Sequence, residues 1–136
     1  MIFGIGTDMV EIARINSMLA RWGDAAARRI LAVEELADYQ LSTDRSRFLA
    51  KRFAVKEALA KALGTGLRAP VLLTSIALTH DSLGKPQLSL GAELQSFLSA
   101  RAITQHHVSI SDERLYALAF IVLEADSVEP SLEQNS

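Results

Sequence analysis

The sequence predicts a single α+β domain in which an antiparallel sheet of about five short strands packs against a long central helix. Three observations favour this fold class. Residues 47–66 have the composition of a long helix and end in a Gly-Thr-Gly loop. Short β-branched and apolar runs, bounded by turn-forming residues, occur on both sides of that helix. The chain has 136 residues, of which 49% are hydrophobic, so it is long enough to bury one core.

The central helix is expected over residues 47–66. Ala, Leu, Lys, Arg and Glu, all good helix formers, fill this segment, and Gly64 stands where a left-handed C-cap residue is required. Its large apolar side chains project onto one broad arc, which is the face expected to pack inward. They are Phe48, Leu49, Phe53, Val55, Leu59 and Leu63.

Two cations, Arg52 and Lys56, interrupt this apolar arc, and Glu57 and Lys61 lie at its edge. Burying a cation costs free energy unless an anionic group meets it. One interpretation is structural: Arg52 and Lys56 extend their charged ends to water, and Glu57 and Lys61 form an ordinary helix salt bridge. The other interpretation is a site that brings a carboxylate and several cations together, as a phosphorylated, metal-assisted substrate requires.

A first strand is predicted at residues 2–5, followed by a glycine-containing segment that ends at Asp8. A dinucleotide-binding fingerprint would need a third glycine where Met9 stands, so the match fails. The glycines are instead expected to allow a tight turn or a close approach to another backbone. Asp8 comes just before a helical pattern at residues 11–21, where its structural role would be that of a helix N-cap.

Basic side chains recur on and just after the helix predicted at residues 11–21, around the apolar Met18. These cations are Arg14, Arg21, Arg28 and Arg29. They form either a solvated helix face, as runs of charge usually do, or a docking face for an acidic partner. In the second interpretation Met18 is the adaptable apolar centre of the face.

Shorter elements complete the predicted fold. They are helical segments at 25–30, 33–41 and 91–102, and strands at 72–79, 87–90, 107–111 and 115–124. The strands form two hairpins, because turn-forming residues separate the members of each pair. From residue 125 onward Ser, Glu, Pro, Gln and Asn predominate, so we expect a domain at 1–124 and a disordered tail at 125–136.

Composition excludes several classes of protein. The formal net charge of −2 gives no support for nucleic-acid binding driven by overall charge. The absence of cysteine excludes disulfides, thiolate zinc sites and a cysteine nucleophile. No segment approaches the ~20 apolar residues of a membrane span, and no signal-peptide pattern is present, so we expect a cytoplasmic protein that does not bind membranes.

The residues alone indicate a small set of candidates for chemistry. Asp8 and Glu57 are carboxylates on separate elements, and Mg²⁺ prefers one or two carboxylates with water and substrate phosphates. The cations Arg52, Lys56 and Lys61 and the backbone amides of Gly64-Thr65-Gly66 would bind phosphate. His106 and His107 are adjacent on a predicted strand and point to opposite faces, so they do not easily enter one site together.

Two long motifs resemble a known family. GIGTDMVEIARI at 4–15 and RFLAKRFAVKEALAKALGTG at 47–66 are similar to the holo-acyl-carrier-protein synthases, the small 4′-phosphopantetheinyl transferases. The turn at 83–86 and the strand at 107–111 also fit, and the resemblance covers residues 1–124. It implies the fold of that family. It also implies an enzyme of fatty acid biosynthesis that transfers phosphopantetheine from coenzyme A to a serine of apo acyl carrier protein and releases adenosine 3′,5′-bisphosphate.

The resemblance also assigns roles to single residues. Asp8 and Glu57 would be the Mg²⁺ ligands, and Lys61 would meet the diphosphate, so these three residues form the catalytic set. The coenzyme A cleft would be lined by Arg52, Lys61, Gly64, Thr65, Gly66, Lys85, Pro86 and His107. The basic first helix of the family docks the acidic carrier protein, and the matching residues are Arg14, Met18, Arg21 and Arg28. The group that takes the serine proton stays open between a carboxylate and a water held by a carboxylate.

The family forms trimers with active sites between neighbouring subunits, and the resemblance implies the same assembly here. Such an assembly would account for charged residues on an arc that is internal within one chain. One departure is visible: many relatives have His after the strand that ends at Ser111, whereas this chain has Asp112.

Two other functions compete with the transferase. A non-catalytic module that binds carrier protein would keep the basic helix, but the presence of Asp8, Glu57 and Lys61 disfavours it. A small Mg²⁺-dependent nucleotide hydrolase would use the same carboxylates on another phosphate ester. Release of bisphosphate only when carrier protein is present would distinguish transfer from hydrolysis.

Overall fold

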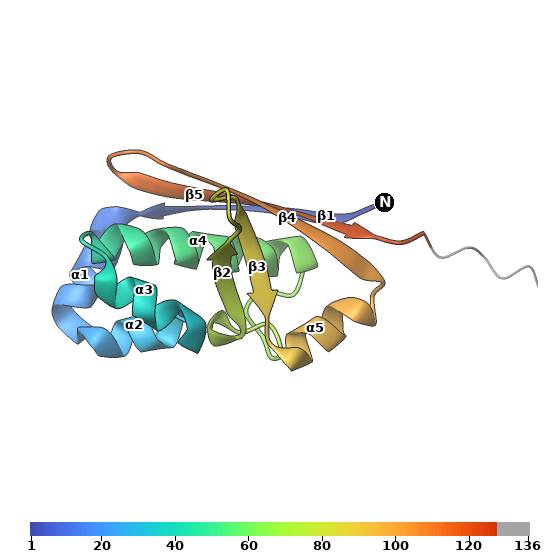
Figure 1. Cartoon of the computed structure of the whole chain (residues 1–136), viewed down its shortest axis with the longest axis horizontal. Coiled ribbons are helices and arrows are strands. Elements are labelled where there is room, and N and C mark those ends of the chain that lie inside the picture. Colours follow the sequence, from blue (N-terminus) through green and yellow to red (C-terminus); the bar gives the residue numbers. More distant parts are fainter. Residues whose placement is uncertain (128–136) are drawn as a thin grey trace, which may run out of the picture.

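The computed structural model describes residues 1–127 and has the predicted α+β architecture. A three-stranded antiparallel sheet lies along one side of the central helix α4 (Arg45–Leu63), and short helices and a separate hairpin cover the other side (Figure 1). The helix is therefore the middle layer of the molecule. The predicted fold class is confirmed.

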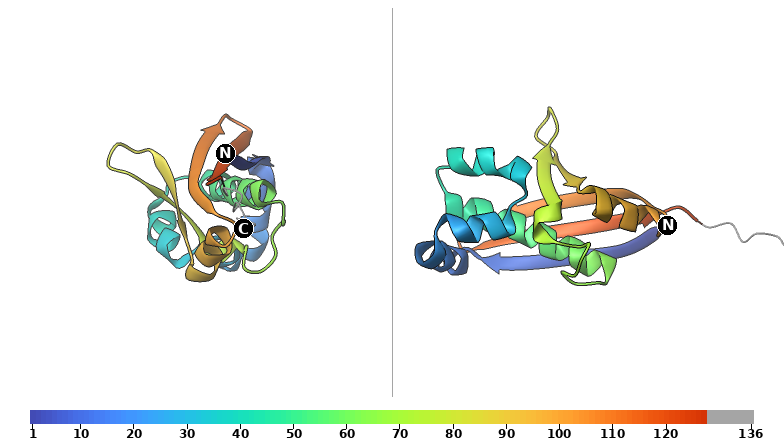
Figure 2. Two further views of the ribbon diagram at one scale, coloured as in Figure 1. Left: turned by 90° about the vertical axis from the view of Figure 1, so that its right-hand side faces the viewer. Right: turned by 90° about the horizontal axis from the view of Figure 1, so that it is seen from below.

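The main sheet has the strand order β1-β5-β4, and each strand is ten residues long. The strands are β1 (Ile2–Glu11), β4 (Ile103–Asp112) and β5 (Tyr116–Ala125). A second, two-stranded sheet consists of β2 (Ile76–His80) and β3 (Pro86–Leu90). The expectation of one sheet of short strands was therefore wrong in this detail, because the β2–β3 hairpin pairs only with itself and projects from the body (Figure 2).

Strand β1 is longer than predicted because its inward positions alternate through to its end. Gly4, Gly6, Asp8 and Val10 face α4, while the residues between them are exposed. A Cβ atom on Gly6 would lie 1.9 Å from the carbonyl oxygen of Ala58. The glycines therefore serve a close approach of strand to helix rather than a turn.

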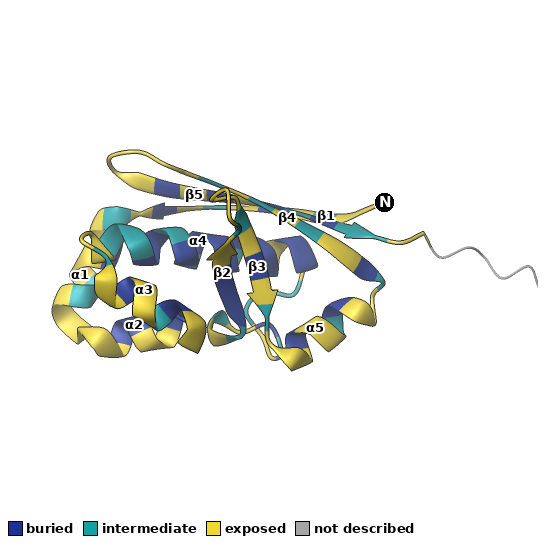
Figure 3. Ribbon diagram, viewed as in Figure 1, coloured by how far each residue is buried: buried dark blue, intermediate teal, exposed yellow. Residues whose placement is uncertain are grey.

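Helix α4 begins and ends as its sequence predicts. The Oδ1 atom of Asp44 accepts a hydrogen bond from the Arg47 amide at 3.1 Å, and Gly64 ends the helix with φ 76°. Leu49, Val55 and Leu59 are fully buried, and the alanines on the sheet-facing side are buried as well (Figure 3). Burial on two sides of the helix is the consequence of its position between two layers.

The remaining helices are all shorter than α4. They are α1 (Ile12–Trp22), α2 (Asp24–Ile30), η1 (Val33–Glu35), α3 (Leu36–Leu41), η2 (Leu73–Ser75) and α5 (Ala92–Ser99). All the predicted helical segments are present with shifted ends. In the part of the chain that the structure describes, no helix is both long and apolar enough to cross a membrane.

The domain prediction placed the end of the fold at residue 124 and a tail after it. Strand β5 continues to Ala125, whose amide donates to the Met1 carbonyl at 2.8 Å. Residues 128–136, which include most of the predicted tail, lie outside the described residues.

Candidate active site

Asp8 and Glu57 line one cleft of about 620 Å³ between β1, α1 and α4. Asp8 comes from the inward face of β1, and Glu57 comes from the face of α4 beside that strand. Arg14 of α1 and Leu73 of η2 line the cleft on its other sides. The structure thus brings together the two carboxylates that the sequence placed on separate elements.

Asp8 is part of β1 and does not cap a helix. Its backbone pairs with Ala119 of β5, and the strand continues to Glu11 before α1 begins at Ile12. The N-cap interpretation was wrong because the alternation of β1 carries Asp8 toward α4 instead. This orientation leaves its carboxylate free to face the cleft.

Lys61 pairs with Asp8 and not with Glu57 as the helix spacing had suggested. Its Nζ atom donates to Asp8 Oδ1 at 3.0 Å and to the Thr7 carbonyl at 3.0 Å. Among residues 1–127, no cation forms an ion pair with Glu57. The Lys61 side chain is 54% exposed, so its ammonium group is able to reach another anion, but the Asp8 side chain is only 16% exposed and would then need a second cation as its partner.

Burial raises the pKa of Glu57, and the negative charge of Asp8 raises it further, while Lys61 opposes both effects. The two carboxylates are therefore close enough to repel each other. A cation placed between the two carboxylates would reduce this repulsion.

The donor set fits Mg²⁺ better than a metal held entirely by protein. In the described part of the chain, no group of three His, Cys, Asp or Glu side chains lies close enough to bind a metal. Mg²⁺ usually keeps several waters and is held by one or two carboxylates together with substrate phosphates. Asp8 and Glu57 supply that number of carboxylates beside an open cleft.

The predicted docking residues lie on neighbouring surfaces. Met18 lines both the cleft and an adjacent apolar groove with Trp22, and the Arg21 guanidinium lies 4.9 Å from the Trp22 ring centroid. Arg28 lines a different hollow, between α2 and α3. The docking role of these residues stays a prediction.

Arg52 and Lys56 neither extend to water nor enter the cleft. Both are buried and meet Glu35, with Arg52 Nε 3.0 Å from Oε2 and Lys56 Nζ 2.5 Å from Oε1. Burial lowers the pKa of both cations, and Glu35 opposes this shift. The phosphate-binding interpretation of Lys56 was wrong for this reason. The Arg52 guanidinium also lies 3.5 Å from the Phe48 ring centroid. The assignment of Arg52 to the coenzyme A cleft stays a prediction.

Sequence reasoning did not find Glu35. Two cations on a core-facing arc require a buried anion, and Glu35 stands three residues after the end of the buried run at residues 30–32. Glu34 and Glu35 are adjacent near the start of the helical segment predicted at 33–41, and this position gives no sign that one of them is buried. The pairing depends on tertiary packing, since helix α3 and a loop separate η1 from α4 in the sequence.

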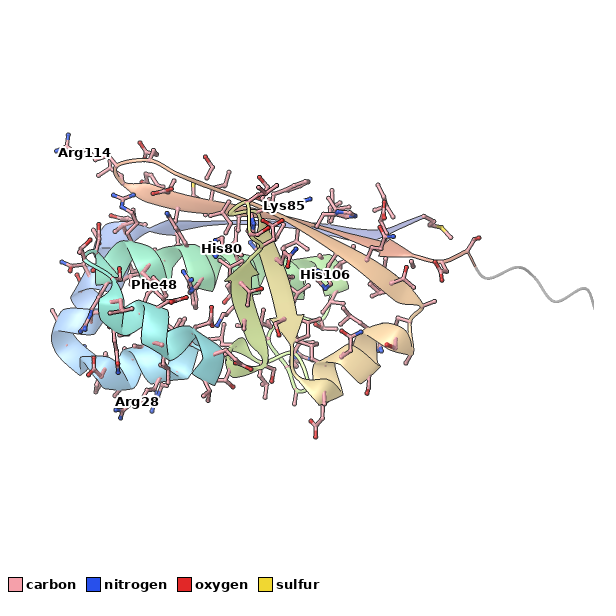
Figure 4. All side chains as sticks on the ribbon, viewed as in Figure 1. Arg28, Phe48, His80, Lys85, His106 and Arg114 are labelled. Carbon is pink, nitrogen blue, oxygen red and sulfur yellow. The ribbon has the colours of Figure 1, made fainter. Side chains whose placement is uncertain are left out.

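The other residues predicted to bind coenzyme A lie apart from Asp8 and Glu57 within one chain. Thr65 lies in the loop after α4, Lys85 lies in the turn of the β2–β3 hairpin (Figure 4), and His107 pairs with Glu124 at 3.3 Å on the exposed face of the main sheet. His106 is partly buried on the other face, as the alternation predicted, and burial lowers its pKa. The coenzyme A contacts of these residues stay predictions.

Asp112, the departure from the family pattern, binds two cations of α4. Its Oδ2 atom accepts from Arg47 at 2.8 Å, and its Oδ1 atom lies 3.3 Å from Lys51 Nζ. Burial alone would raise the pKa of Asp112, but the hydrogen bonds from Arg47 and Lys51 lower it overall. Asp112 thereby holds the turn between β4 and β5 on the first turns of α4.

The model of the 4′-phosphopantetheinyl transferase superfamily matches residues 4–121, a range that contains both long motifs and the whole cleft. The chain belongs to this superfamily. The resemblance inferred from the two motifs is thereby confirmed, and with it the expectation of a transferase fold and a transferase enzyme.

Individual members of the superfamily are similar along nearly their whole length. The holo-[acyl-carrier-protein] synthase of Laribacter hongkongensis is 58% identical over 124 residues, which cover 91% of this chain and 99% of that protein. The crystal structure of holo-[acyl-carrier-protein] synthase from Neisseria meningitidis has a TM-score of 0.89 and 45% identity, covering 91% of this chain and 99% of the other. The enzyme from Bacillus anthracis, solved in complex with CoA (3′,5′-ADP), has a TM-score of 0.77 and 35% identity, covering 93% and 99%.

Proposed function

We propose that this protein transfers the 4′-phosphopantetheine group of coenzyme A to a serine hydroxyl of an apo acyl carrier protein and releases adenosine 3′,5′-bisphosphate. The observation that carries the proposal is the meeting of Asp8 and Glu57 at one open cleft, with Lys61 paired to Asp8. Membership of the superfamily and the similarity to holo-[acyl-carrier-protein] synthases support this choice of substrates. The proposal includes a role in fatty acid biosynthesis in the cytoplasm, as the family resemblance implies.

The chemistry is a phosphoryl transfer. Asp8 and Glu57 would hold Mg²⁺, which when bound would neutralise charge on the diphosphate. The serine oxygen forms a bond to the phosphorus that carries pantetheine, and the bond from that phosphorus to the bridging oxygen breaks. The electron pair of the broken bond leaves with the bisphosphate. Lys61 would leave Asp8 and donate to a phosphate oxygen, where its charge stabilises the leaving group.

The proton of the serine hydroxyl passes to a carboxylate or to a water held by one. Both routes fit the position of Asp8 and Glu57 at the cleft. Since the reaction depends mainly on positioning and electrostatics, it needs few side chains with strongly shifted pKa values.

The carrier protein is expected to dock on the basic surface of the first two helices. Arg14 would lie at the edge where the cleft opens, with Met18 beside it as an apolar contact. Arg21 and Arg28 would extend the positive surface along α1 and α2 toward an acidic partner.

We further propose a homotrimer with active sites between subunits. Support comes from the outward face of the main sheet, where Met9 and Leu118 are register neighbours that are 62% and 40% exposed. Ile5 and Phe120 extend this apolar face, which monomers rarely leave uncovered. A neighbouring subunit would also bring Gly64 to Gly66, Lys85, Pro86 and His107 into a shared coenzyme A cleft.

The test is release of adenosine 3′,5′-bisphosphate from coenzyme A in the presence of Mg²⁺, measured with and without apo acyl carrier protein. Transfer predicts release only when the carrier protein is present. Release without it would instead support a nucleotide hydrolase. Binding of the carrier protein with no release under either condition would leave a non-catalytic binding module.

A further inference from the structure

A buried charged cluster lies on the side of α4 that faces the short helices. Glu35 is 2% exposed, Arg52 6% and Lys56 0%. The Glu35 carboxylate accepts from the Ala32 amide at 2.9 Å and from the Leu78 amide at 3.2 Å, in addition to its contacts with the two cations. One carboxylate therefore joins η1, α4 and β2.

Lys56 is the residue of α4 that forms directed hydrogen bonds in this cluster. Its Nζ atom donates to Glu35 Oε1 at 2.5 Å and to the Ile30 carbonyl at 2.6 Å. Arg52 contacts Glu35 as an ion pair, but its Nε–H makes no hydrogen bond in the described part of the chain. Ile30 also lines the cleft that contains Asp8 and Glu57. The bonds of Lys56 thus link α4 to the cleft wall formed by the end of α2.

On the opposite side of α4, Lys61 and Arg47 form ion pairs with the main sheet, but both side chains are partly exposed, whereas Lys56 is buried. There, β1 lies against the backbone of Ala58 through Gly6, which has no side chain to engage the helix. A carboxylate that lies about 6 Å from the helix axis would move by about 1 Å if α4 rotated by about 10°. A misplacement of about 1 Å is enough to lower a reaction rate by about 100-fold.

Stability alone is a poor explanation for this cluster. A buried ion pair often stabilises a protein no more than apolar side chains of similar volume would. The sequence instead places Lys56 directly before Glu57, on the helix whose orientation aims that carboxylate. We propose that Lys56, held by Glu35 and by the Ile30 carbonyl, is a positioning residue that fixes the rotation of α4 and thereby places the Glu57 carboxylate beside Asp8. This inference rests on the proposed function.

The test variant is Lys56→Met, which keeps an apolar stem and leaves Glu35 and Arg52 as a neutral pair. Two quantities are measured on folded protein: kcat, and the gain in coenzyme A affinity that Mg²⁺ gives over a chelator, determined by calorimetry. Because the substitution removes a support behind the metal site, we expect kcat to fall by about 30-fold and the Mg²⁺-dependent gain by about tenfold. The KM for carrier protein should change by less than about threefold, since α1 keeps its own contacts.

The control is Leu94→Ala, a cavity variant in α5, which packs against β4 away from the cleft. It should lower the denaturation midpoint while leaving kcat and the Mg²⁺-dependent gain of the folded protein unchanged. A folded Lys56→Met variant with wild-type values of both quantities would overturn the proposal, as would equal losses in Leu94→Ala.

If Lys56→Met does not fold, Lys56→Gln, which keeps a hydrogen-bond donor, takes its place with the same expected losses. Failure of both to fold would give Lys56 a role in folding alone and would also overturn the proposal. The wild-type protein is assayed in parallel. If the wild type shows no turnover, it is the proposed function that fails.

Discussion

Glu57 is the carboxylate on which the proposed chemistry depends most. Burial and the charge of Asp8 favour its protonated form, while the exposed Lys61 pairs with Asp8 instead. In the absence of metal, Glu57 therefore adds repulsion to the cleft rather than stability. This balance makes Glu57 the residue whose removal should separate activity from folding.

We expect Glu57→Gln to abolish detectable Mg²⁺-dependent transfer, a loss of at least about 100-fold in kcat, because the metal loses a charged ligand. The fold should stay intact, and the denaturation midpoint of the metal-free protein should not fall, because a repulsive charge is removed. The measurements are kcat and thermal unfolding, with Glu93→Gln on exposed α5 as the control. A normal kcat would remove Glu57 from the metal site.

The raised pKa of Glu57 predicts that the free energy of unfolding depends on pH. Because the folded pKa of Glu57 lies above its ordinary value of 4.5, the folded state binds this proton more tightly than the unfolded state. Its contribution to stability is fully present below pH 4.5 and is lost as pH rises through the folded pKa. With a chelator present, wild type should lose more unfolding free energy between pH 4 and pH 7 than Glu57→Gln does. Parallel curves for the two proteins would contradict the shift.

The residues proposed to carry the reaction were easier to predict than the partner of the two buried cations. Asp8, Glu57 and Lys61 stand in motifs that are local in sequence, and the structure places all three at or beside the cleft. The partners of Arg52 and Lys56 were not predicted, because Glu35 reaches them only through tertiary packing. A helical projection gives the direction of a side chain, but it does not give the group that the side chain meets.

Among the elements, the contact between β1 and α4 places the two carboxylates side by side. The strand was predicted to end at Ile5, because a polar Asp8 after two glycines resembles the end of a strand. The structure extends it to Glu11, since the glycines and Asp8 occupy alternate inward positions against the helix. The length of a strand whose inner face begins with two glycines and an aspartate is difficult to predict from sequence alone.

Gly6→Ala should therefore separate β1 from α4. Its Cβ would lie 1.9 Å from the Ala58 carbonyl oxygen, and relief of this clash should lower the free energy of unfolding by about 2–3 kcal/mol. Chemical denaturation measures this loss. The matched control is Gly91→Ala, whose Cβ would meet Ser75 atoms at 3.6 Å, an ordinary contact. Equal stability of the two variants would show that β1 does not need the close approach.

At the scale of the whole molecule, the main sheet covers α4 with one face and leaves its other face exposed. The exposed face carries apolar residues on β1 and β5 and polar residues on β4, such as Ser109 and Ser111. The sequence alone did not predict this face, because the strands were expected in one larger sheet. The trimer was inferred from the family resemblance and stays a proposal, which this exposed apolar face supports.

Phe120→Glu places a charge on this face, where the side chain is exposed in a single chain. If subunits assemble through the face, sedimentation should show a trimer for wild type and smaller species for the variant, because burying an unpaired charge is costly. Transfer activity should fall with the loss of the trimer. Val33→Glu, at an exposed position on η1, is the control and should remain a trimer. A monomeric wild type with full activity would contradict the assembly.

Intact-mass spectrometry of an apo acyl carrier protein, after incubation with this protein, coenzyme A and Mg²⁺, is the decisive test of the proposed transfer. We expect a gain of one phosphopantetheine mass on the carrier protein, abolished by a chelator and by Glu57→Gln. An unchanged mass across several carrier proteins that bind the protein would contradict the transferase. A gain that persists in the chelator would contradict the role given to Asp8 and Glu57.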